Sequence, residues 1–492
     1  MMAYITATEG FAVLAVFAAI MIGLVYFLTK RKFKTIDLFL VADRNVSWFR
    51  GAFSIAVSWI WAPALFVASM QAYTTGLAGA FWFIVPNIAC FFLFAPLAIR
   101  LRRLMPNGYT LPEFILKRYN NDKRTHLAFL FIFFAYQLGA IIINALAGGT
   151  LLHILTGMNF HIAVISLSVI ALIYSLISGL EASIITDVLQ MAFILITGFV
   201  LVPWAIFTAG GLSAVAGGLS GIAGSSFIFD PWIAYSFGIA MTFGLLSGPI
   251  GDQMFFQRGF AVKKKNIVKT FVVGGLLFGL VPITLSLLGF VAANPLINSA
   301  LSISDPQMVA PIVIGAFLPK IALLLFVFMA FAGLCSTMDS AYCAVSSLGT
   351  IDIYKKYINA NARSQKLLQV SRAFMLGIAV FGTGIALLQP KLLWVFLIYG
   401  ALSSAGLFPT IFSLFWNKLD AKGAFWAVTL SLVLGLPLSI YANVVENTHL
   451  IVLAAVLSVL IGLVVCLIAG IRNKERYKFI FCQEPPVNRR VA

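Results

Sequence analysis

The chain has 492 residues, of which 61% are hydrophobic and 10% are charged, and its formal net charge is +17. Soluble domains carry about 25% charged residues, so this composition excludes an ordinary soluble protein and indicates a membrane domain. The excess of Lys and Arg does not indicate a nucleic-acid partner, because these residues cluster in short segments at alternate ends of apolar stretches. Such clusters are typical of cytoplasmic loops, which face anionic membrane lipid.

About 13 apolar stretches are each long enough to cross the ~30 Å hydrocarbon core of a bilayer. In chain order, the predicted spans cover about residues 8–29, 48–72, 79–99, 126–155, 158–178, 183–207, 232–256, 267–293, 320–348, 368–388, 391–416, 421–443 and 448–471. Three connections are also distinctive: a cytoplasmic surface helix at about 110–124, a Gly-rich external loop at about 209–230, and an external segment around Pro306 and Pro311. We expect an all-α transmembrane domain over residues 1–471 and a short basic cytoplasmic tail over 472–492.

The basic clusters also set the expected orientation. Lys30, Arg31 and Lys32 follow the first span, and further basic residues follow the last one. The positive-inside rule then places the N-terminus outside and the C-terminus in the cytoplasm, in a multi-pass protein of the plasma membrane. The same rule predicts that Gln257 and Arg258 lie in a cytoplasmic loop.

Two spans contain helix breakers. The second has Pro63 soon after Trp61, and the seventh contains the Ser-Gly-Pro-Ile-Gly run at 247–251. A proline inside a membrane helix removes a backbone hydrogen bond and can unwind the helix, although an ordinary kink is the alternative. Interrupted helices at corresponding positions of two repeats indicate a transporter's binding site. The spacing fits inverted five-helix repeats at about 48–207 and 232–416, with one extra N-terminal and two extra C-terminal helices.

The same breaks predict a solute pocket. Trp59 and Trp61 flank the first break, and aromatic side chains there would wall a site for a small polar solute. Ser247 and Gly248 begin the second break and are candidate solute-binding residues. Asp252 and Gln253 follow it and are expected near the cytoplasmic mouth, as a gate.

The ninth span carries a stripe of small and hydroxyl-bearing residues, namely Gly333, Ser336, Thr337 and Ser340. Residues three and four apart share one face of a helix, so these four project together. A membrane helix that offers only oxygen ligands suits a hard cation such as sodium. An unwound second span would add free backbone carbonyls to the same ion.

Two acidic residues lie within apolar spans. Asp187 is near the start of the sixth span, and Asp339 flanks the hydroxyl stripe. A carboxylate in a membrane costs at least about 2.5–3.5 kcal/mol unless it is paired or hydrated, so we expect both to meet a cation or proton. The alternative for Asp187 is an acid that reaches the cytoplasmic interface. No phosphate-binding loop and no nucleophile–base or metal constellation is evident, so neither ATP-driven transport nor an enzyme is expected.

Four ordered motifs resemble the sodium:solute symporter family over about residues 35–440. They are the segment 37–44 before the second span, the pair 178–182 and 186–190, the pairs 252–253 and 257–258, and the run 335–340 followed by 352–354. The resemblance implies the LeuT-type inverted-repeat fold with 13 helices. It also implies a sodium site made of the backbone carbonyls of Val57, Ile60 and Gly333 and the hydroxyls of Ser336 and Thr337.

Some members of that family hold a second sodium ion, and Asp187 and Ser340 match that pattern. Asp339 stands where a serine ligand is often found, so it is a candidate for a second cation or a proton. Residues 58–62, followed by Phe81 and Trp82, resemble the urea-permease branch. Urea, an amino acid and a small carboxylate all remain open as solutes.

The expected function is secondary active import of a small polar solute coupled to sodium. A proton-coupled permease of the same fold is one alternative, and a membrane sensor without net transport is another. The tail after about residue 471 is short for a signalling domain, which argues against the sensor. No obligatory protein partner is evident from the sequence.

Overall fold

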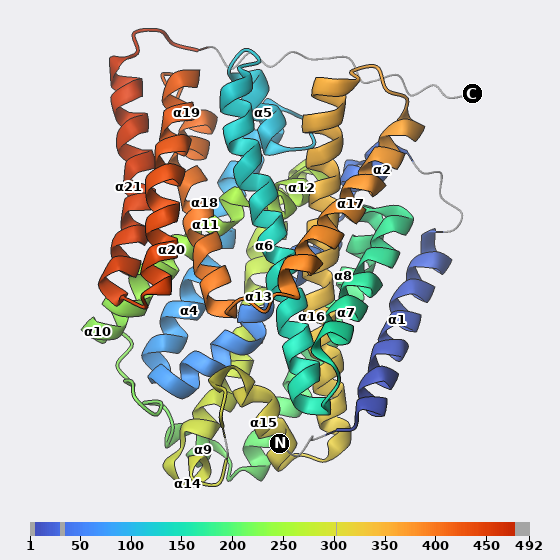
Figure 1. The fold of residues 1–492 in the computed structure, drawn as a ribbon, viewed down its shortest axis with the longest axis vertical. Coiled ribbons are helices and arrows are strands. Elements are labelled where there is room, and N and C mark those ends of the chain that lie inside the picture. The colour runs from blue at the N-terminus through green and yellow to red at the C-terminus, as the bar shows by residue number, and fades with distance from the viewer. Residues whose placement is uncertain (1–4, 30–34, 302, 478–492) are drawn as a thin grey trace.

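The computed structural model describes residues 5–29, 35–301 and 303–477, so the predicted basic cluster at 30–32 and most of the predicted tail lie outside it. The described chain is a bundle of long helices (Figure 1). In chain order the α-helices are α1 Ala7–Thr29, α2 Ile36–Val41, α3 Trp48–Ser58, α4 Ala62–Leu104, α5 Leu111–Arg118, α6 Lys123–Thr156, α7 Phe160–Ser178, α8 Leu180–Thr208, α9 Leu212–Ala216, α10 Pro231–Ile233, α11 Ile239–Gly251, α12 Gln253–Ala261, α13 Ile267–Ala293, α14 Pro295–Asn298, α15 Val309–Phe317, α16 Lys320–Ser347, α17 Ser364–Ala386, α18 Leu392–Phe415, α19 Ala421–Leu430, α20 Leu436–Val444 and α21 Thr448–Arg472.

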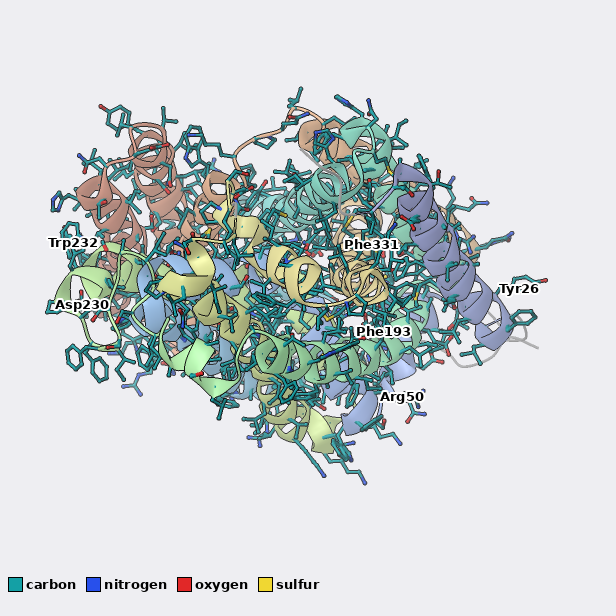
Figure 2. All side chains as sticks on the ribbon, turned by 90° about the horizontal axis from the view of Figure 1, so that it is seen from below. Tyr26, Arg50, Phe193, Asp230, Trp232 and Phe331 are labelled. Atoms are coloured by element: carbon teal, nitrogen blue, oxygen red, sulfur yellow. The ribbon has the colours of Figure 1, made fainter. Side chains whose placement is uncertain are left out.

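Within the described residues, 12 helices are long and apolar enough to cross a membrane. The helices at the rim present large apolar side chains outward, as a lipid-facing surface requires. Figure 2 shows α1 at the edge of the bundle with Tyr26 directed away from it, whereas the fully buried Phe331 of α16 lies among the helices. Helices α5 and α19 lie at the end where α21 finishes, and α9, α14 and α15 lie at the opposite end (Figure 1).

The second and third predicted spans differ from the structure. The second is divided between α3 and the start of α4, and α4 then continues through the whole third span as one helix of 43 residues. Its backbone leaves the helical region only at Gly76, where φ is 72° and ψ is −155°. The predicted loop at about 72–79 is therefore a single-residue bend, which glycine permits because it has no Cβ.

Gly76 also lets the segment that follows α9 dock against the bend. The Leu77 N–H donates to the carbonyl of Leu219 at 2.8 Å, and a Cβ on Gly76 would lie 2.5 Å from the backbone carbon of Ser220. We expect Gly76→Ala to lower the free energy of unfolding by at least about 1–3 kcal/mol, because this φ/ψ region is essentially restricted to glycine. Thermal unfolding of the purified protein in detergent measures the loss.

Gly198 of α8 is the matched control for that substitution. A Cβ there meets nothing within 4 Å. Gly198→Ala should therefore leave stability unchanged or raise it by about 0.5–1 kcal/mol, since alanine favours the helix. Equal melting temperatures for the two variants would contradict the proposed role of the bend.

Both predicted helix breaks are present, the first at its predicted position and the second just after its predicted position. The first occupies Trp59 to Trp61, and Pro63 lies in the first turn of α4, where a missing N–H leaves no helical bond unmade. The predicted break at 247–251 is wrong, because α11 stays helical through Pro249. The chain leaves the helix at Asp252, with φ −104° and ψ 113°, and the Asp252 carboxylate caps α12 by accepting from the Met254 N–H at 2.7 Å.

Three further elements differ from the sequence prediction. The ninth span does not end at about 348, since a π-helical segment, Leu348–Ile358, continues α16. The helix predicted at about 110–124 is the shorter α5, and it is packed rather than lying on the surface, because Leu111, Phe114 and Ile115 are fully buried. The two segments that were predicted to be external contain short helices, α9 in the first and α14 and α15 in the second.

Candidate functional site

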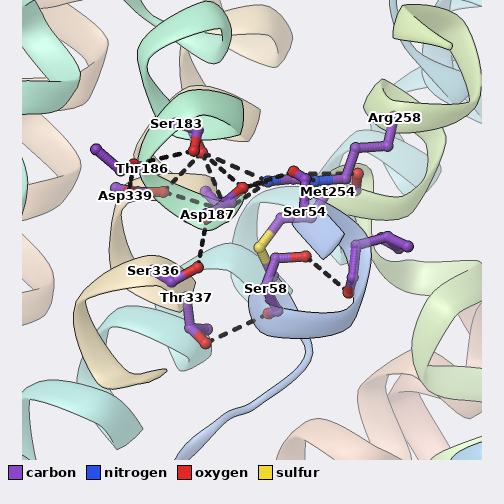
Figure 3. Close-up of polar contacts among 12 residues, drawn as sticks. Ser54, Ser58, Ser183, Thr186, Asp187, Met254, Arg258, Ser336, Thr337 and Asp339 are labelled. Atoms are coloured by element: carbon purple, nitrogen blue, oxygen red, sulfur yellow. Dashed lines mark hydrogen bonds and ion pairs between the residues drawn. The ribbon is translucent and has the colours of Figure 1, made fainter. Parts of the chain in front are cut away.

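The end of α3 and the middle of α16 meet at the first break. The Thr337 hydroxyl of α16 lies 3.3 Å from the Ser58 carbonyl (Figure 3). It also lies 3.2 Å from the Ile60 carbonyl. Both carbonyls are available because the break removes the helical N–H partners that they would otherwise have. A fully buried hydroxyl and two backbone carbonyls from separate spans therefore converge at this point.

Gly333 permits this close approach. A Cβ at Gly333 would lie 3.1 Å from Cγ2 of Ile60 and 3.5 Å from the Ile60 carbonyl oxygen. Of the five residues predicted for the sodium site, the structure thus brings Ile60, Gly333 and Thr337 together. Val57 lies at the end of α3, where its carbonyl accepts from the Ile60 N–H at 2.9 Å. Sequence reasoning missed the Ser58 carbonyl, which the same break frees.

Ser336 faces a second polar cluster next to the first. Its hydroxyl donates to Oδ1 of Asp187 at 2.5 Å. The other carboxylate oxygen of Asp187 accepts from the Ser54 hydroxyl of α3 at 2.5 Å and pairs with the guanidinium of Arg258 at 3.0 Å (Figure 3). Asp187 and Arg258 are both 0% exposed, so this ion pair lies wholly inside the bundle.

The prediction that Arg258 lies in a cytoplasmic loop is wrong. All nine residues of α12 are buried, and the side chain of Arg258 enters the centre of the bundle. Its Nε donates to Ser54 at 2.9 Å and its Nη2 to Ser340 at 2.7 Å. The Phe-rich sequence Met-Phe-Phe-Gln-Arg-Gly-Phe around it was the signal for burial, because a water-exposed loop seldom carries so many aromatic side chains.

Asp339 joins the same cluster from α16. One of its oxygens accepts from the Ser183 hydroxyl at 2.7 Å and from the Ser340 hydroxyl at 3.2 Å. The other is 3.5 Å from the Thr186 hydroxyl. Arg258 thus reaches both carboxylates, Asp187 directly and Asp339 through Ser340. Sequence reasoning identified the two acids, but it missed Ser54, Ser183 and Arg258.

A pocket opens on the other side of the first break. It encloses about 780 Å³ of unfilled space, including the part open to solvent, and extends from the break to the end of α20 and the start of α21. Its polar lining consists of Trp59, Trp61, Asn87, Tyr136, Tyr399, Ser404, Ser439 and Asn443. Every residue that lines it within the described chain is uncharged.

The two tryptophans of the break differ in their hydrogen bonding. The Trp59 indole N–H donates to the Asn87 side-chain oxygen at 3.1 Å. The indole nitrogen of Trp61 is buried and has no hydrogen-bond partner among the described residues. An unpaired buried donor at a pocket wall is suited to a ligand that brings an acceptor oxygen.

Ser247 and Gly248 are not in the pocket lining, contrary to the sequence prediction; Gly244 and Leu245, one turn earlier on α11, line it instead. The Ser247 hydroxyl faces Ser403 and Ser404 of α18, at 3.1 and 2.9 Å. Gly248 packs against the ring of Trp59, because a Cβ there would lie 2.7 Å from Cη2 of that ring. Both residues therefore lie behind the pocket wall and help to set its position.

Asp252 and Gln253, predicted as a gate, are fully buried. Asp252 accepts from the Gln137 side chain of α6 at 2.9 Å. The Gln253 side chain donates to the Tyr109 carbonyl at 2.9 Å, which ties α12 to the turn before α5. At the same turn, burial and the neighbouring Asp37 carboxylate, which accepts a hydrogen bond from the phenol, raise the pKa of Tyr109.

The profile of the sodium:solute symporter family matches residues 39–431. A urea-proton symporter of rice, Oryza sativa subsp. japonica, is 25% identical over 88% of this chain and 65% of its own length, so this chain spans about two thirds of that relative. A sodium/glucose cotransporter of Vibrio parahaemolyticus is 26% identical over 85% of this chain and 83% of its own length.

The fold comparison agrees. A solved Na⁺-coupled sialic acid symporter in a substrate-bound outward-open state superposes with a TM-score of 0.77, covering 94% of this chain and 97% of that protein at 18% identity. The predicted all-helical LeuT-type fold is thereby confirmed. The family profile covers most of the sequence and includes both helix breaks, the oxygen-rich face of α16 and the buried Asp187. The chain belongs to the sodium:solute symporter family.

Proposed function

We propose that this protein is a secondary active symporter that imports a small neutral polar solute together with a sodium ion. One observation carries the proposal: hydroxyl and carbonyl oxygens of Thr337, Ser58 and Ile60, from two separate spans, converge inside the bundle at a helix break. A hydroxyl donates one hydrogen bond and keeps lone pairs that face a cation. Such an oxygen-only set suits a hard monovalent ion.

The pocket chemistry favours a neutral solute among the three classes that the sequence left open. An amino acid or a small carboxylate would bring charge into a buried space whose described lining holds no opposite charge, and that is costly. A urea-type solute instead brings a carbonyl oxygen for the Trp61 N–H and N–H groups for the Asn87, Tyr and Ser oxygens. The rice relative is named a urea-proton symporter, and this also supports urea as the solute.

The mechanism follows from the shared position of the two sites. Sodium held by Ile60 and Thr337 fixes the end of α3 against α16, and so positions Trp59 and Trp61 at the solute pocket. One charge that crosses 100 mV supplies about 2.3 kcal/mol, and a tenfold ion gradient adds about 1.4 kcal/mol. One sodium ion per solute therefore sustains roughly a few-hundred-fold accumulation. In this proposal the protein lies in the plasma membrane, with the start of α1 outside and the end of α21 in the cytoplasm.

Proton coupling is the second candidate, because the rice relative is a urea-proton symporter and because Asp339 is a second buried carboxylate in the same cluster. The two candidates are separated by purified protein in liposomes loaded with potassium. Uptake of labelled urea is measured with an inward sodium gradient at equal pH, and then with an inward proton gradient without sodium. Uptake driven by sodium alone supports the proposal, whereas uptake driven only by protons favours the second candidate.

The same liposomes test the solute class. Unlabelled urea, a neutral amino acid and acetate are each preloaded, and exchange with labelled urea is followed. Exchange with urea alone is the expected result, because only urea fits an uncharged lining without leaving a charge unpaired. Exchange driven equally well by acetate would contradict the neutral-solute proposal.

Trp61→Phe tests the pocket itself. The substitution keeps an aromatic ring but removes the unpaired indole N–H. We expect the KM for urea to rise about 3- to 10-fold, the effect of one lost hydrogen bond of roughly 0.5–1.5 kcal/mol. Trp82→Phe is the matched control, because Trp82 of α4 also has a buried unpaired N–H and is not part of the described lining. An equal change in KM for both variants would argue against the Trp61 contact.

A further inference from the structure

The guanidinium of Arg258 holds the centre of the cluster beside the proposed sodium site. It is fully buried, and its contacts come from three helices other than its own. Nε donates to Ser54 of α3, and Nη2 lies 3.0 Å from Oδ2 of Asp187 on α8 and 2.7 Å from Oγ of Ser340 on α16. Figure 3 shows this side chain reaching from α12 toward Asp187.

The oxygens around Arg258 are the ligands that a second transported cation would need. Asp187 and Ser340 offer a carboxylate and a hydroxyl, and Asp339 stands beside them. A guanidinium cannot be removed by deprotonation at physiological pH, so the positive charge is permanent. A metal cation at the same oxygens would therefore meet a fixed like charge and would displace two charge-assisted hydrogen bonds.

We infer that Arg258 is the resident cation of this second site, so that the transporter binds and moves one metal ion per cycle rather than two. The inference rests on the proposed sodium site at Ile60 and Thr337 and adds its stoichiometry. It also predicts that sodium can occupy the second site only when the guanidinium of Arg258 is absent. Removing the guanidinium leaves the carboxylates of Asp187 and Asp339 among oxygen ligands without the positive charge of Arg258, and sodium then binds there.

The test is equilibrium binding of radioactive sodium to the purified full-length protein in detergent. Arg258→Gln removes the charge and keeps hydrogen-bonding groups, and we expect it to bind one sodium ion more than the wild type. Arg258→Lys keeps the charge and should match the wild type. The double variant Arg258→Gln/Asp187→Asn restores the charge balance and should lose the extra ion.

The difference between Arg258→Gln and the wild type tests the inference, whereas the wild-type value tests the proposed sodium site. One ion in the wild type and two in Arg258→Gln supports both. No ion in the wild type and one in Arg258→Gln rejects the site at Thr337 but supports the role of Arg258. Two ions in the wild type, or no gain in a folded Arg258→Gln, overturns the inference. If Arg258→Gln does not fold, the wild type and Arg258→Lys decide: one ion in each supports the inference, and two in either overturns it.

Discussion

Asp187→Ala should lower the free energy of unfolding by about 3–5 kcal/mol, the largest loss expected for a single substitution in this protein. The reason is the charge that the substitution leaves behind. Arg258 is 0% exposed and pairs with Asp187 at 3.0 Å, so removing the carboxylate leaves a guanidinium buried without its counter-charge. The hydroxyls of Ser54 and Ser336 also lose their acceptor. Thermal unfolding and the yield of monodisperse protein in detergent measure the effect.

Asp420→Ala provides the comparison. The Asp420 carboxylate caps α19 by accepting from the Gly423 N–H at 2.9 Å, and losing such a cap costs about 0.5–2 kcal/mol. The double variant Asp187→Asn/Arg258→Gln should be more stable than either single change, since it removes both members of the ion pair together. If Asp187→Ala and Asp420→Ala melt at the same temperature, the buried ion pair does not stabilise the fold as described.

Loss of sodium-dependent transport is the second large effect, and Ser336→Ala combined with Thr337→Val should produce it. Thr337→Val keeps the shape of the side chain and removes only the hydroxyl near the Ser58 and Ile60 carbonyls. An interaction between a hydroxyl and a charged group contributes about 1.5–3 kcal/mol, so loss of the Thr337 ligand alone should weaken sodium binding about 10- to 100-fold. Ser336→Ala removes the hydroxyl that donates to Asp187 beside the site. The sodium concentration for half-maximal urea uptake in proteoliposomes measures the change.

Ser346→Ala is the matched control on the same helix. Ser346 is also fully buried in α16, but its hydroxyl donates to the Cys343 carbonyl of its own helix, at 2.7 Å. Its removal should leave the half-saturating sodium concentration within about twofold of the wild type, because such local bonds are weakly stabilising. Unchanged sodium affinity in Ser336→Ala/Thr337→Val would remove the main support for the sodium site.

The oxygen stripe of α16 illustrates what a pattern can predict. Gly333, Ser336 and Thr337 follow helical spacing in an apolar segment, so their common face can be predicted without coordinates. The distances to the α3 break cannot, because they depend on how two spans separated by more than 200 residues pack. The structure places the Thr337 hydroxyl at the Ile60 carbonyl, but it turns Ser336 toward Asp187.

The positions of the breaks show a second limit. Proline and glycine mark helix interruptions only approximately, because a proline in a first turn costs no hydrogen bond and one inside a helix can be tolerated. Pro63 is the first case and Pro249 the second. The pocket lining is also displaced from the prediction, because Gly244 and Leu245 line it instead of Ser247 and Gly248, one turn later.

By itself, the sequence determined the membrane class, most of the spans and the oxygen-rich face of α16. These follow from hydropathy and periodicity, which are properties of short windows of the chain. Only the tertiary structure decided that Arg258 is internal. A basic residue near three lysines is typical of a cytoplasmic loop. The residues around Arg258 do not indicate its partner, because the Asp187 carboxylate that compensates its buried charge lies 71 residues away in the sequence. Charge compensation between distant segments is a property of packing.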